Sequence, residues 1–169
     1  MEIRLMPVKI EQKKSLYNLY QYYHYDFSQY TDEDLGLDGR FEIDLDHIWE
    51  DPRWNPYLIC SQDKIIGFLI ILFENYDTDP DPTHVIYDFM ILRKYRRRGL
   101  GKIAAVQAFD LYQANWKVVQ MKSNEPAIHF WRNVVNEYTS GQYSEVFRED
   151  ISKFVQAFNN RTPSHYPLK

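Results

Sequence analysis

The residues with the clearest chemical meaning form a short basic turn that contains two glycines. Gly99 and Gly101 lie between an apolar stretch and a segment with helical spacing. Four basic residues surround them: Arg96, Arg97, Arg98 and Lys102. The first N–H groups of a helix have no partner within the helix and lie at the positive end of its dipole. Because glycine leaves room for an anion to approach these groups, the turn predicts a diphosphate-binding site.

Hydrophobic periodicity predicts the elements that position this turn. Apolar runs predict strands at 2–8, 57–61, 64–74, 84–92 and 116–122, and two more within 143–158. Helical spacing predicts helices at 12–25, 41–50 and 100–111, and a last one that Ser123 or Asn124 caps. The resulting order β-α-α-β-β-β-α-β-α-β-β predicts an α/β fold, with a mixed sheet of about seven strands and helices on both faces.

Composition narrows the class of protein. The 169 residues fit a single domain over 1–169, and the 44% of hydrophobic residues can form a core. The longest apolar run, 65–73, is too short to cross a bilayer, so no membrane partner is expected. A single cysteine, Cys60, excludes an internal disulfide and fits a reducing compartment. Since the start of the chain also lacks an apolar signal core, we expect a cytoplasmic protein.

Charge and histidine spacing exclude further classes. The net charge of −4 argues against general nucleic-acid binding. The charge is unevenly distributed, with a net −11 over residues 1–92 and a net +7 over 93–169. The acidic half of the chain is thus suited to bind a cation and the basic half to bind an anion. Acidic and basic residues that are simply solvated at the surface would give the same counts. The five histidines have no close ligand spacing, so no metal site is expected.

The basic turn resembles the acetyl-CoA-binding turn of the GNAT acetyltransferase superfamily. Residues 96–101 match the family pattern Arg/Gln-x-x-Gly-x-Gly/Ala at each fixed position. The strand before the turn, 86–91, is similar to the family's fourth strand. Asn124, Ala127 and Phe130 match the Asn-x-x-Ala-x-x-Phe pattern that opens the family's last major helix. The resemblance implies a GNAT fold, and transfer of acetyl from acetyl-CoA to a primary amine by direct attack in a ternary complex.

The resemblance also implies which residues would bind the coenzyme. Its pantetheine arm would pair with the backbone of Phe89, Met90 and Ile91, and an N–H near Ile91 would polarise the acetyl carbonyl. The residues that would hold the diphosphate are Arg96, Arg97, Arg98, Gly99, Leu100, Gly101 and Lys102. Asn124 would contact the pantetheine arm or fix the adjoining strands.

The acid and base that the reaction would use stay open at this stage. Trp131 occupies the position where the family usually has a tyrosine near the sulfur. An indole N–H can donate a hydrogen bond but cannot release a proton at neutral pH. Protonation of the thiolate is therefore left to another tyrosine such as Tyr138, to water, or to no group. Glu74 and Asp88 are the nearest carboxylates for a general base that acts directly or through water.

The first predicted helix and the loop after it border the acceptor pocket in the family. Aromatic and acidic residues there would form a wall suited to a cationic amine: Tyr22, Tyr25, Asp26, Asp32, Glu33 and Asp34. A catalytically weak CoA-binding sensor or interaction module of the same fold is the alternative to an enzyme. Exposed sheet edges would also allow a homodimer.

Overall fold

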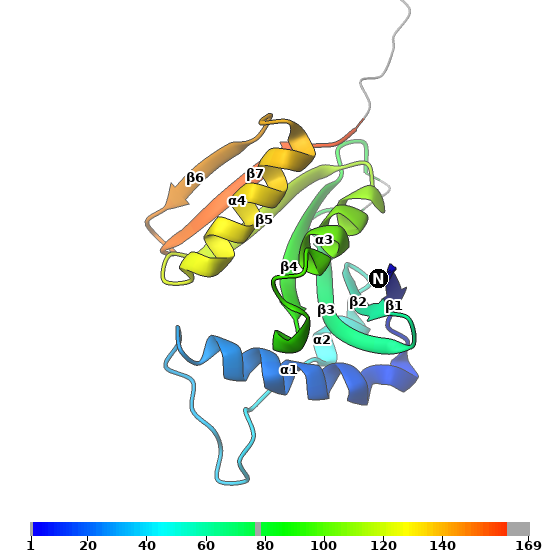
Figure 1. Cartoon of the computed structure of the whole chain (residues 1–169), viewed down its shortest axis with the longest axis vertical. Helices are drawn as coiled ribbons and strands as arrows, with labels where there is room; N and C mark the ends of the chain where they lie inside the picture. Colours follow the sequence, from blue (N-terminus) through cyan, green and yellow to red (C-terminus); the bar gives the residue numbers. More distant parts are fainter. Residues whose placement is uncertain (1, 77–78, 162–169) are drawn as a thin grey trace, which may run out of the picture.

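One sheet of seven strands organises the described part of the chain, residues 2–76 and 79–161 of this computed structural model (Figure 1). The strands are β1 (Ile3–Pro7), β2 (Trp54–Ser61), β3 (Lys64–Phe73), β4 (Thr83–Ile91), β5 (Asn115–Met121), β6 (Ser144–Arg148) and β7 (Lys153–Asn159). The helices are α1 (Lys13–Phe27), α2 (Asp46–Glu50), α3 (Leu100–Asp110) and α4 (Glu125–Thr139), with 3₁₀ turns at Ile10–Gln12 and Arg93–Tyr95. This order confirms the predicted α/β mixed sheet.

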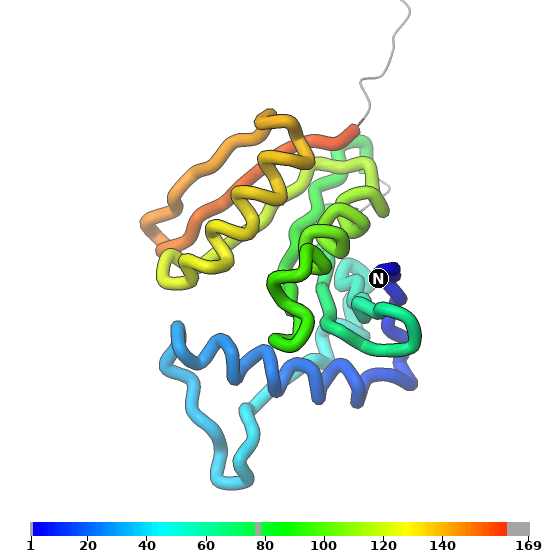
Figure 2. Tube along the Cα trace, in the orientation of Figure 1, coloured from blue at the N-terminus to red at the C-terminus, as the bar shows by residue number. Residues whose placement is uncertain are grey.

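The strands lie in the order β1-β2-β3-β4-β5-β7-β6, and every neighbouring pair is antiparallel except β4 and β5. β4 and β5 pair only from Thr83 to Ile86 and from Asn115 to Val118. Beyond these positions β4 continues to Ile91 while β5 turns away (Figure 2). The sheet is therefore continuous at one end of this pair and split at the other.

A bulge in β4 accompanies the split. Ile70 of β3 pairs with Asp88, but the next residue, Ile71, pairs with Ile86, which leaves Tyr87 as an extra residue in β4. A bulge bends its strand and reverses the alternation of side chains. Ile86 accordingly packs on the face that α3 and α4 cover, whereas Asp88 bonds to side chains of α1 on the opposite face.

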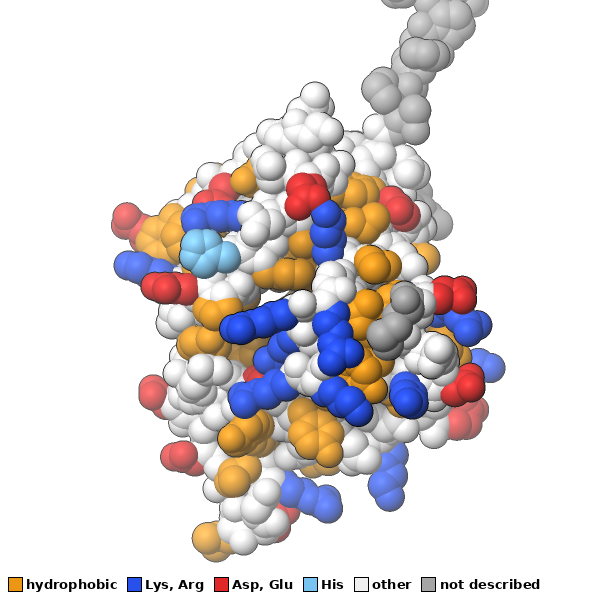
Figure 3. Space-filling view, in the orientation of Figure 1, with side chains coloured by type: hydrophobic (Ala, Val, Ile, Leu, Met, Phe, Trp, Pro, Cys, Tyr) orange, Lys and Arg blue, Asp and Glu red, His pale blue; other side chains and the backbone are white. Residues whose placement is uncertain are grey.

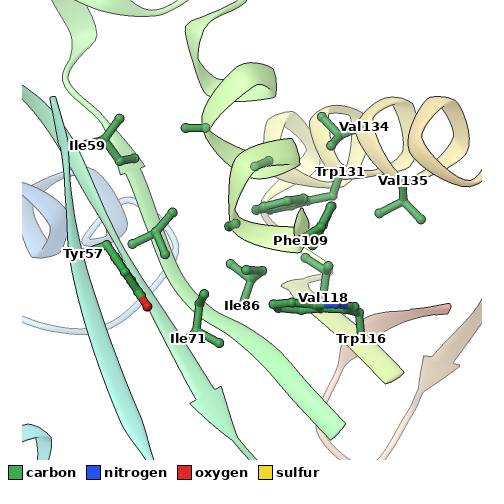
Figure 4. Close-up of a cluster of buried hydrophobic side chains, with 14 of the residues drawn as sticks. Tyr57, Ile59, Ile71, Ile86, Phe109, Trp116, Val118, Trp131, Val134 and Val135 are labelled. Carbon is green, nitrogen blue, oxygen red and sulfur yellow. The ribbon is translucent and has the colours of Figure 1, made fainter. Parts of the chain in front are cut away.

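Helices cover both faces of the sheet, as the sequence predicts. On one face, Phe109 of α3 and Trp131 of α4 pack over the fully buried Trp116 of β5 (Figure 4). On the other face, α1 and α2 pack through Leu16 and Ile48, with Met90 of β4 in the same cluster. Helices therefore pack on both faces of the sheet, α3 and α4 on one and α1 and α2 on the other.

The second helix is shorter than the sequence predicts. It begins at Asp46 rather than at Phe41, because the Phe41 backbone is occupied by a side chain of α1. Gln21 Oε1 accepts from the Phe41 N–H at 2.9 Å, and Gln21 Nε2 donates to the Phe41 carbonyl at 3.0 Å. The predicted turn at 75–82 includes positions 77–78, which lie outside the described residues. In the described ranges, no helix has the length and apolar character needed to span a bilayer.

Candidate functional site

The split in the sheet leaves backbone hydrogen-bonding groups of β4 at an open edge. The Leu92 N–H donates to the Ile66 carbonyl at 2.8 Å on the β3 side. Because successive residues of a strand alternate in direction, the N–H and C=O groups of Phe89 and Ile91 point the other way, to the side that β5 has left. Arg96 Nε donates to the Ile91 carbonyl at 2.6 Å, in agreement with this direction. An extended ligand can pair with this edge as an added strand would.

Two adjoining cavities open from this edge. The one we call the turn cavity measures about 540 Å³ and reaches Arg97 and Gly101; the sheet cavity measures about 430 Å³ and reaches Glu74 and Asp88. Six residues line both: Tyr23, Phe27, Phe89, Asn124, Ala127 and Trp131. The two cavities therefore form one cleft that runs from the basic turn to the split between β4 and β5.

The glycine turn exposes the N-terminus of α3. Gly99 caps the helix with a φ of +74°, a conformation that strains other residues, and a Cβ there would meet no atom within 4 Å. Gly101 faces the cavity floor, where a Cβ would lie 3.3 Å from the Phe130 ring and 3.5 Å from the Ile91 side chain. The first N–H groups of α3 thus open onto free space beside the turn cavity, as an anion site requires.

The four basic residues of the turn differ in what they bind. Within the described ranges, Arg97 and Arg98 are exposed and have no acidic partner, whereas Lys102 pairs with Glu137 of α4 and Arg96 pairs with Asp26 of α1. Figure 3 shows Lys and Arg side chains gathered over this part of the surface. Positive charge without an internal partner is therefore concentrated at Arg97 and Arg98.

Asp26 links α1 to the turn. Its Oδ1 accepts from Arg93 Nη2 at 2.7 Å and from Arg93 Nε at 3.0 Å, while its Oδ2 accepts from Arg96. Burial of the Asp26 carboxyl raises its pKa, but hydrogen bonds from Arg96 and Arg93 outweigh burial and hold the pKa below its usual value. Asp26 lines the turn cavity. The sequence places it in the acidic acceptor wall and does not predict its bonds to Arg93 and Arg96.

Asp88 is held by two tyrosines of α1. Tyr20 donates its hydroxyl to Asp88 Oδ2 at 2.6 Å, and Tyr23 donates to Oδ1 at 2.7 Å. Burial raises the pKa of Asp88, and the two hydrogen bonds offset only part of that effect. Burial, together with the charge of Asp88, raises the pKa of both tyrosines. The carboxyl group therefore lies next to the β4 edge, with one donor on each oxygen.

Glu74, the other predicted carboxylate, lines the sheet cavity from just beyond β3. Its Oε2 lies 2.5 Å from Lys117 Nζ, and both side chains are about two-fifths exposed. In this solvent-exposed ion pair, the charge of Lys117 neutralises that of Glu74. Within the described residues, by contrast, Asp88 has no Lys or Arg partner. The structure thus brings both carboxylates to the cleft in different electrostatic settings.

Trp131 and Asn124 lie in the cleft, as the sequence suggests. Trp131 is 5% exposed and lines both cavities, with its ring 5.1 Å from that of Phe89 in a T-shaped contact. Asn124 Oδ1 accepts from the Ala127 N–H at 3.1 Å and so caps α4. Both side chains line the cleft, so each can pack against a bound ligand.

Tyr138 lies away from the cleft. It is two helical turns beyond Trp131 on α4 and lines neither cavity. Its hydroxyl donates to Asp110 at 2.8 Å and accepts from Asn160 Nδ2 at 3.2 Å, which ties α4 to α3 and to the end of β7. The geometry gives Tyr138 a packing role at this position, so it is not a stand-in for the tyrosine that Trp131 replaces.

Apart from Asp26, the acceptor-wall residues predicted on and after α1 also lie outside the two cavities. Tyr22 and Tyr25 are 60% and 63% exposed, because a helical period of 3.6 turns them away from the sheet. Asp32 and Glu33 are in the loop after α1, where Glu33 Oε2 lies 2.8 Å from His24 Nδ1. The cleft is lined instead by other residues at this end of α1, among them Tyr23, Phe27 and Tyr30.

Two of the predicted coenzyme residues have side chains buried in the core. The side chain of Met90 packs in the core under α1, and that of Leu100 packs in the core under α3 and α4. Among the described residues, no group of three or more His, Cys, Asp or Glu side chains is arranged to hold a metal ion.

Comparison with known proteins identifies similar chains. Residues 14–134 match the model of the acetyltransferase (GNAT) family. An acetyltransferase from Thermus thermophilus has a TM-score of 0.67 at 18% identity, covering 95% of this chain and 98% of its own. A Bacillus subtilis acetyltransferase in complex with CoA has a TM-score of 0.59 at 14% identity, covering 94% and 99%.

A third similar structure is an aminoglycoside acetyltransferase from an uncultured soil metagenomic sample, in complex with sisomicin. It has a TM-score of 0.57 at 17% identity, covering 78% of this chain and 86% of its own. A search among curated protein sequences finds no match. At these identities the solved structures support the fold, and the family match covers the turn, β4, α3, β5 and most of α4.

Proposed function

The chain belongs to the GNAT family of acetyltransferases, and on this premise we propose that it is an N-acetyltransferase that moves acetyl from acetyl-CoA directly to a primary amine. The observation that carries the proposal is the open edge of β4, which leads without interruption to the glycine turn. Acetyl-CoA supplies the activated acetyl thioester. Its diphosphate and its amide-bearing arm match, in order, an exposed helix N-terminus and a free strand edge.

The residues of the turn fit the proposed binding of the diphosphate. The N–H groups at the start of α3 would donate to its oxygens, and Arg97 and Arg98 would add charge without losing an internal ion pair. Phe89 and Ile91 would pair with the pantetheine arm through their backbones. An N–H on this edge would donate to the acetyl carbonyl, where negative charge develops during transfer.

Of the two carboxylates, Asp88 fits the general base better. Glu74 is neutralised by Lys117 in water, while Asp88 lies buried next to Phe89, with its pKa raised toward the range in which a base works well. A protonated acceptor amine would first lose one proton to water, and its nitrogen would then attack the acetyl carbon as the C–S bond breaks. Its proton would pass to Asp88, directly or through one water, and the coenzyme would leave as the thiolate.

Trp131 would serve the departing thiolate only as a hydrogen-bond donor or as a packing surface. Because Tyr138 bonds Asp110 away from the cleft, water is the proton source that we propose for the thiolate. The sheet cavity contains Asp88, which has no Lys or Arg partner among the described residues, and this suits an acceptor that arrives as a cation. One of the similar structures is an aminoglycoside acetyltransferase solved in complex with sisomicin, which adds support for an amine acceptor.

We also propose that the protein works in the cytoplasm, where Cys60, which is buried and free, would stay reduced. One observation favours a second candidate, a CoA-binding module with little catalysis. Trp131 replaces the usual acid, and Tyr138 lines neither cavity.

Two measurements separate the candidates. Calorimetric titration with CoA and acetyl-CoA should show binding in either case. Release of free thiol from acetyl-CoA, measured across a panel of primary amines, should occur only with an enzyme. Asp88→Asn should retain CoA binding and lose thiol release by about 100-fold or more. Binding without thiol release for any amine would favour the module, and no binding of either compound would exclude both.

A further inference from the structure

Tyr20 lies directly beneath Asp88 without reaching the cleft. The residue is 5% exposed and lines neither cavity, whereas Tyr23, one turn further along α1, lines both. The Tyr20 ring packs 4.7 Å from that of Phe68 in β3 and 5.7 Å from that of Tyr23. These contacts hold the ring in one place, so its hydroxyl cannot follow a ligand into the cleft.

The hydroxyls of Tyr20 and Tyr23 bind different oxygens of the Asp88 carboxylate. Tyr20 binds Oδ2 from the core, and Tyr23 binds Oδ1 from the wall of the cleft. A carboxylate has about four sites that can accept a hydrogen bond, so two remain after these bonds are made. Since Tyr20 occupies the oxygen on the core side, the remaining capacity next to the cleft is that of Oδ1.

The groups that face Asp88 come from three elements. They are Tyr20, Tyr23 and His24 of α1, His47 of α2 and Tyr87 of β4. The histidines lie further away and act through charge alone, while only the two tyrosines of α1 donate hydrogen bonds to the carboxylate. Burial has the largest effect on the ionisation of Asp88, and the two hydrogen bonds from α1 offset part of it and fix the orientation of the carboxylate.

We infer that Tyr20 is a positioning residue that acts through Asp88: its hydroxyl anchors Oδ2 in the core and thereby directs Oδ1 toward the acceptor amine. The inference rests on the proposed function, because it assumes that Asp88 takes the proton of the amine. Tyr23 touches the cleft and can also contact the acceptor, but Tyr20 acts only through the carboxylate. A buried carboxylate that lost this donor would be both more mobile and harder to ionise.

The first test follows Asp88 itself and needs no acceptor. In protein labelled with ¹³C at the aspartate carboxyls, the Asp88 signal is assigned by its loss in Asp88→Asn and is titrated with pH. Tyr20→Phe keeps the ring and removes the hydroxyl, so Asp88 should titrate at higher pH than in the wild type. Tyr17→Phe, one turn earlier on α1 and also part of the core cluster, is the matched control and should leave the titration unchanged.

The second test uses whichever amine gives the fastest thiol release with the wild type. Tyr20→Phe should lower kcat/KM for that amine at pH 7 by about tenfold and move its acid limb to higher pH, while the Kd for CoA stays unchanged. Tyr23→Phe removes the other hydrogen bond and should move the Asp88 titration in the same direction. It provides a second reading if Tyr20→Phe proves unstable.

The outcomes separate the inference from the proposed function. An active wild type together with an unshifted Asp88 titration in Tyr20→Phe would overturn the positioning role. A shifted titration with an unchanged pH profile would overturn it as well, since Asp88 would then not be the group that limits the reaction. A wild type that releases thiol with no amine would overturn the proposed function itself.

Discussion

Ile86 and Val118 form the last paired position between β4 and β5. Beyond them the two strands share no further pairing, although β4 extends five residues to Ile91 and β5 extends three to Met121. The cleft begins at this point, and Asp88 lies two residues past it. The end of the parallel pairing between β4 and β5 thus determines where a ligand can enter the sheet. It also determines that Asp88 is a carboxyl group next to that ligand.

Replacement of Gly101 by valine should block the turn cavity. A Cβ at this position already contacts Phe130 and Ile91, so the two methyl groups of valine would take up space beside the α3 N-terminus. We expect Gly101→Val to weaken CoA binding by at least about tenfold by calorimetry. Ile103→Val, on the exposed part of the same helix, is the control and should bind normally. Normal affinity in Gly101→Val would place the diphosphate elsewhere.

Asp88→Asn should make the protein more stable at neutral pH even as it removes activity. The pKa of Asp88 is raised in the folded state, so its favourable contribution is complete below the ordinary aspartate pKa and is lost as pH rises through the raised value. The variant should therefore gain about 1 kcal/mol at pH 7 and nothing near pH 3 in urea unfolding experiments. A variant that is less stable than the wild type at pH 7 would contradict this account of Asp88.

Asp26→Asn should act in the opposite direction. Hydrogen bonds from two guanidiniums lower the pKa of Asp26, so its stabilising effect is present above the ordinary aspartate pKa and is lost as pH falls through the lowered value. Because Arg93 and Arg96 are 65% and 41% exposed, the expected loss at pH 7 is about 1 kcal/mol. Asp32→Asn in the neighbouring loop serves as the control. An equal loss in both variants would remove the special role of Asp26.

Tyr138→Phe should leave catalysis intact. The Tyr138 hydroxyl bonds Asp110 and Asn160 rather than any group in the cleft, so its removal should cost about 1 kcal/mol of stability and leave kcat unchanged. Thermal unfolding and thiol release on the same preparation would measure both effects. A fall in kcat of tenfold or more at unchanged stability would restore Tyr138 as a candidate acid.

The glycine turn could be predicted from the sequence because its conformation depends on local features. Glycine at Gly99 is needed where φ is positive, and the bases lie next to it along the chain. The order of strands and helices was likewise predictable, since period and capping residues mark each element, as Asn124 does for α4. The start of α2 was misplaced by the most residues, because the bonds between Gln21 and Phe41 connect residues twenty positions apart.

The acceptor side was predicted less well, for a physical reason. Simple alternation places Asp88 on the same face of β4 as Ile86, and the bulge at Tyr87 moves it to the face of α1. Without the bulge, no sequence pattern connects Asp88 with Tyr20 and Tyr23. Tyr20 and Tyr23 are three residues apart and so share one helical face, and Asp88 is a carboxylate in an otherwise apolar strand. This combination is the signal that could have suggested their contact.

The unpaired length of β4 has a further consequence for the behaviour of the protein in solution. A strand with free amides on one side is a template on which another polypeptide can add by hydrogen bonding, the first step of aggregation. The coenzyme arm, if it pairs with Phe89 and Ile91 as proposed, would cap that template. Saturating CoA should then slow the increase in light scattering on mild heating. The concentration of the co-substrate would in this way also determine how long the protein resists aggregation.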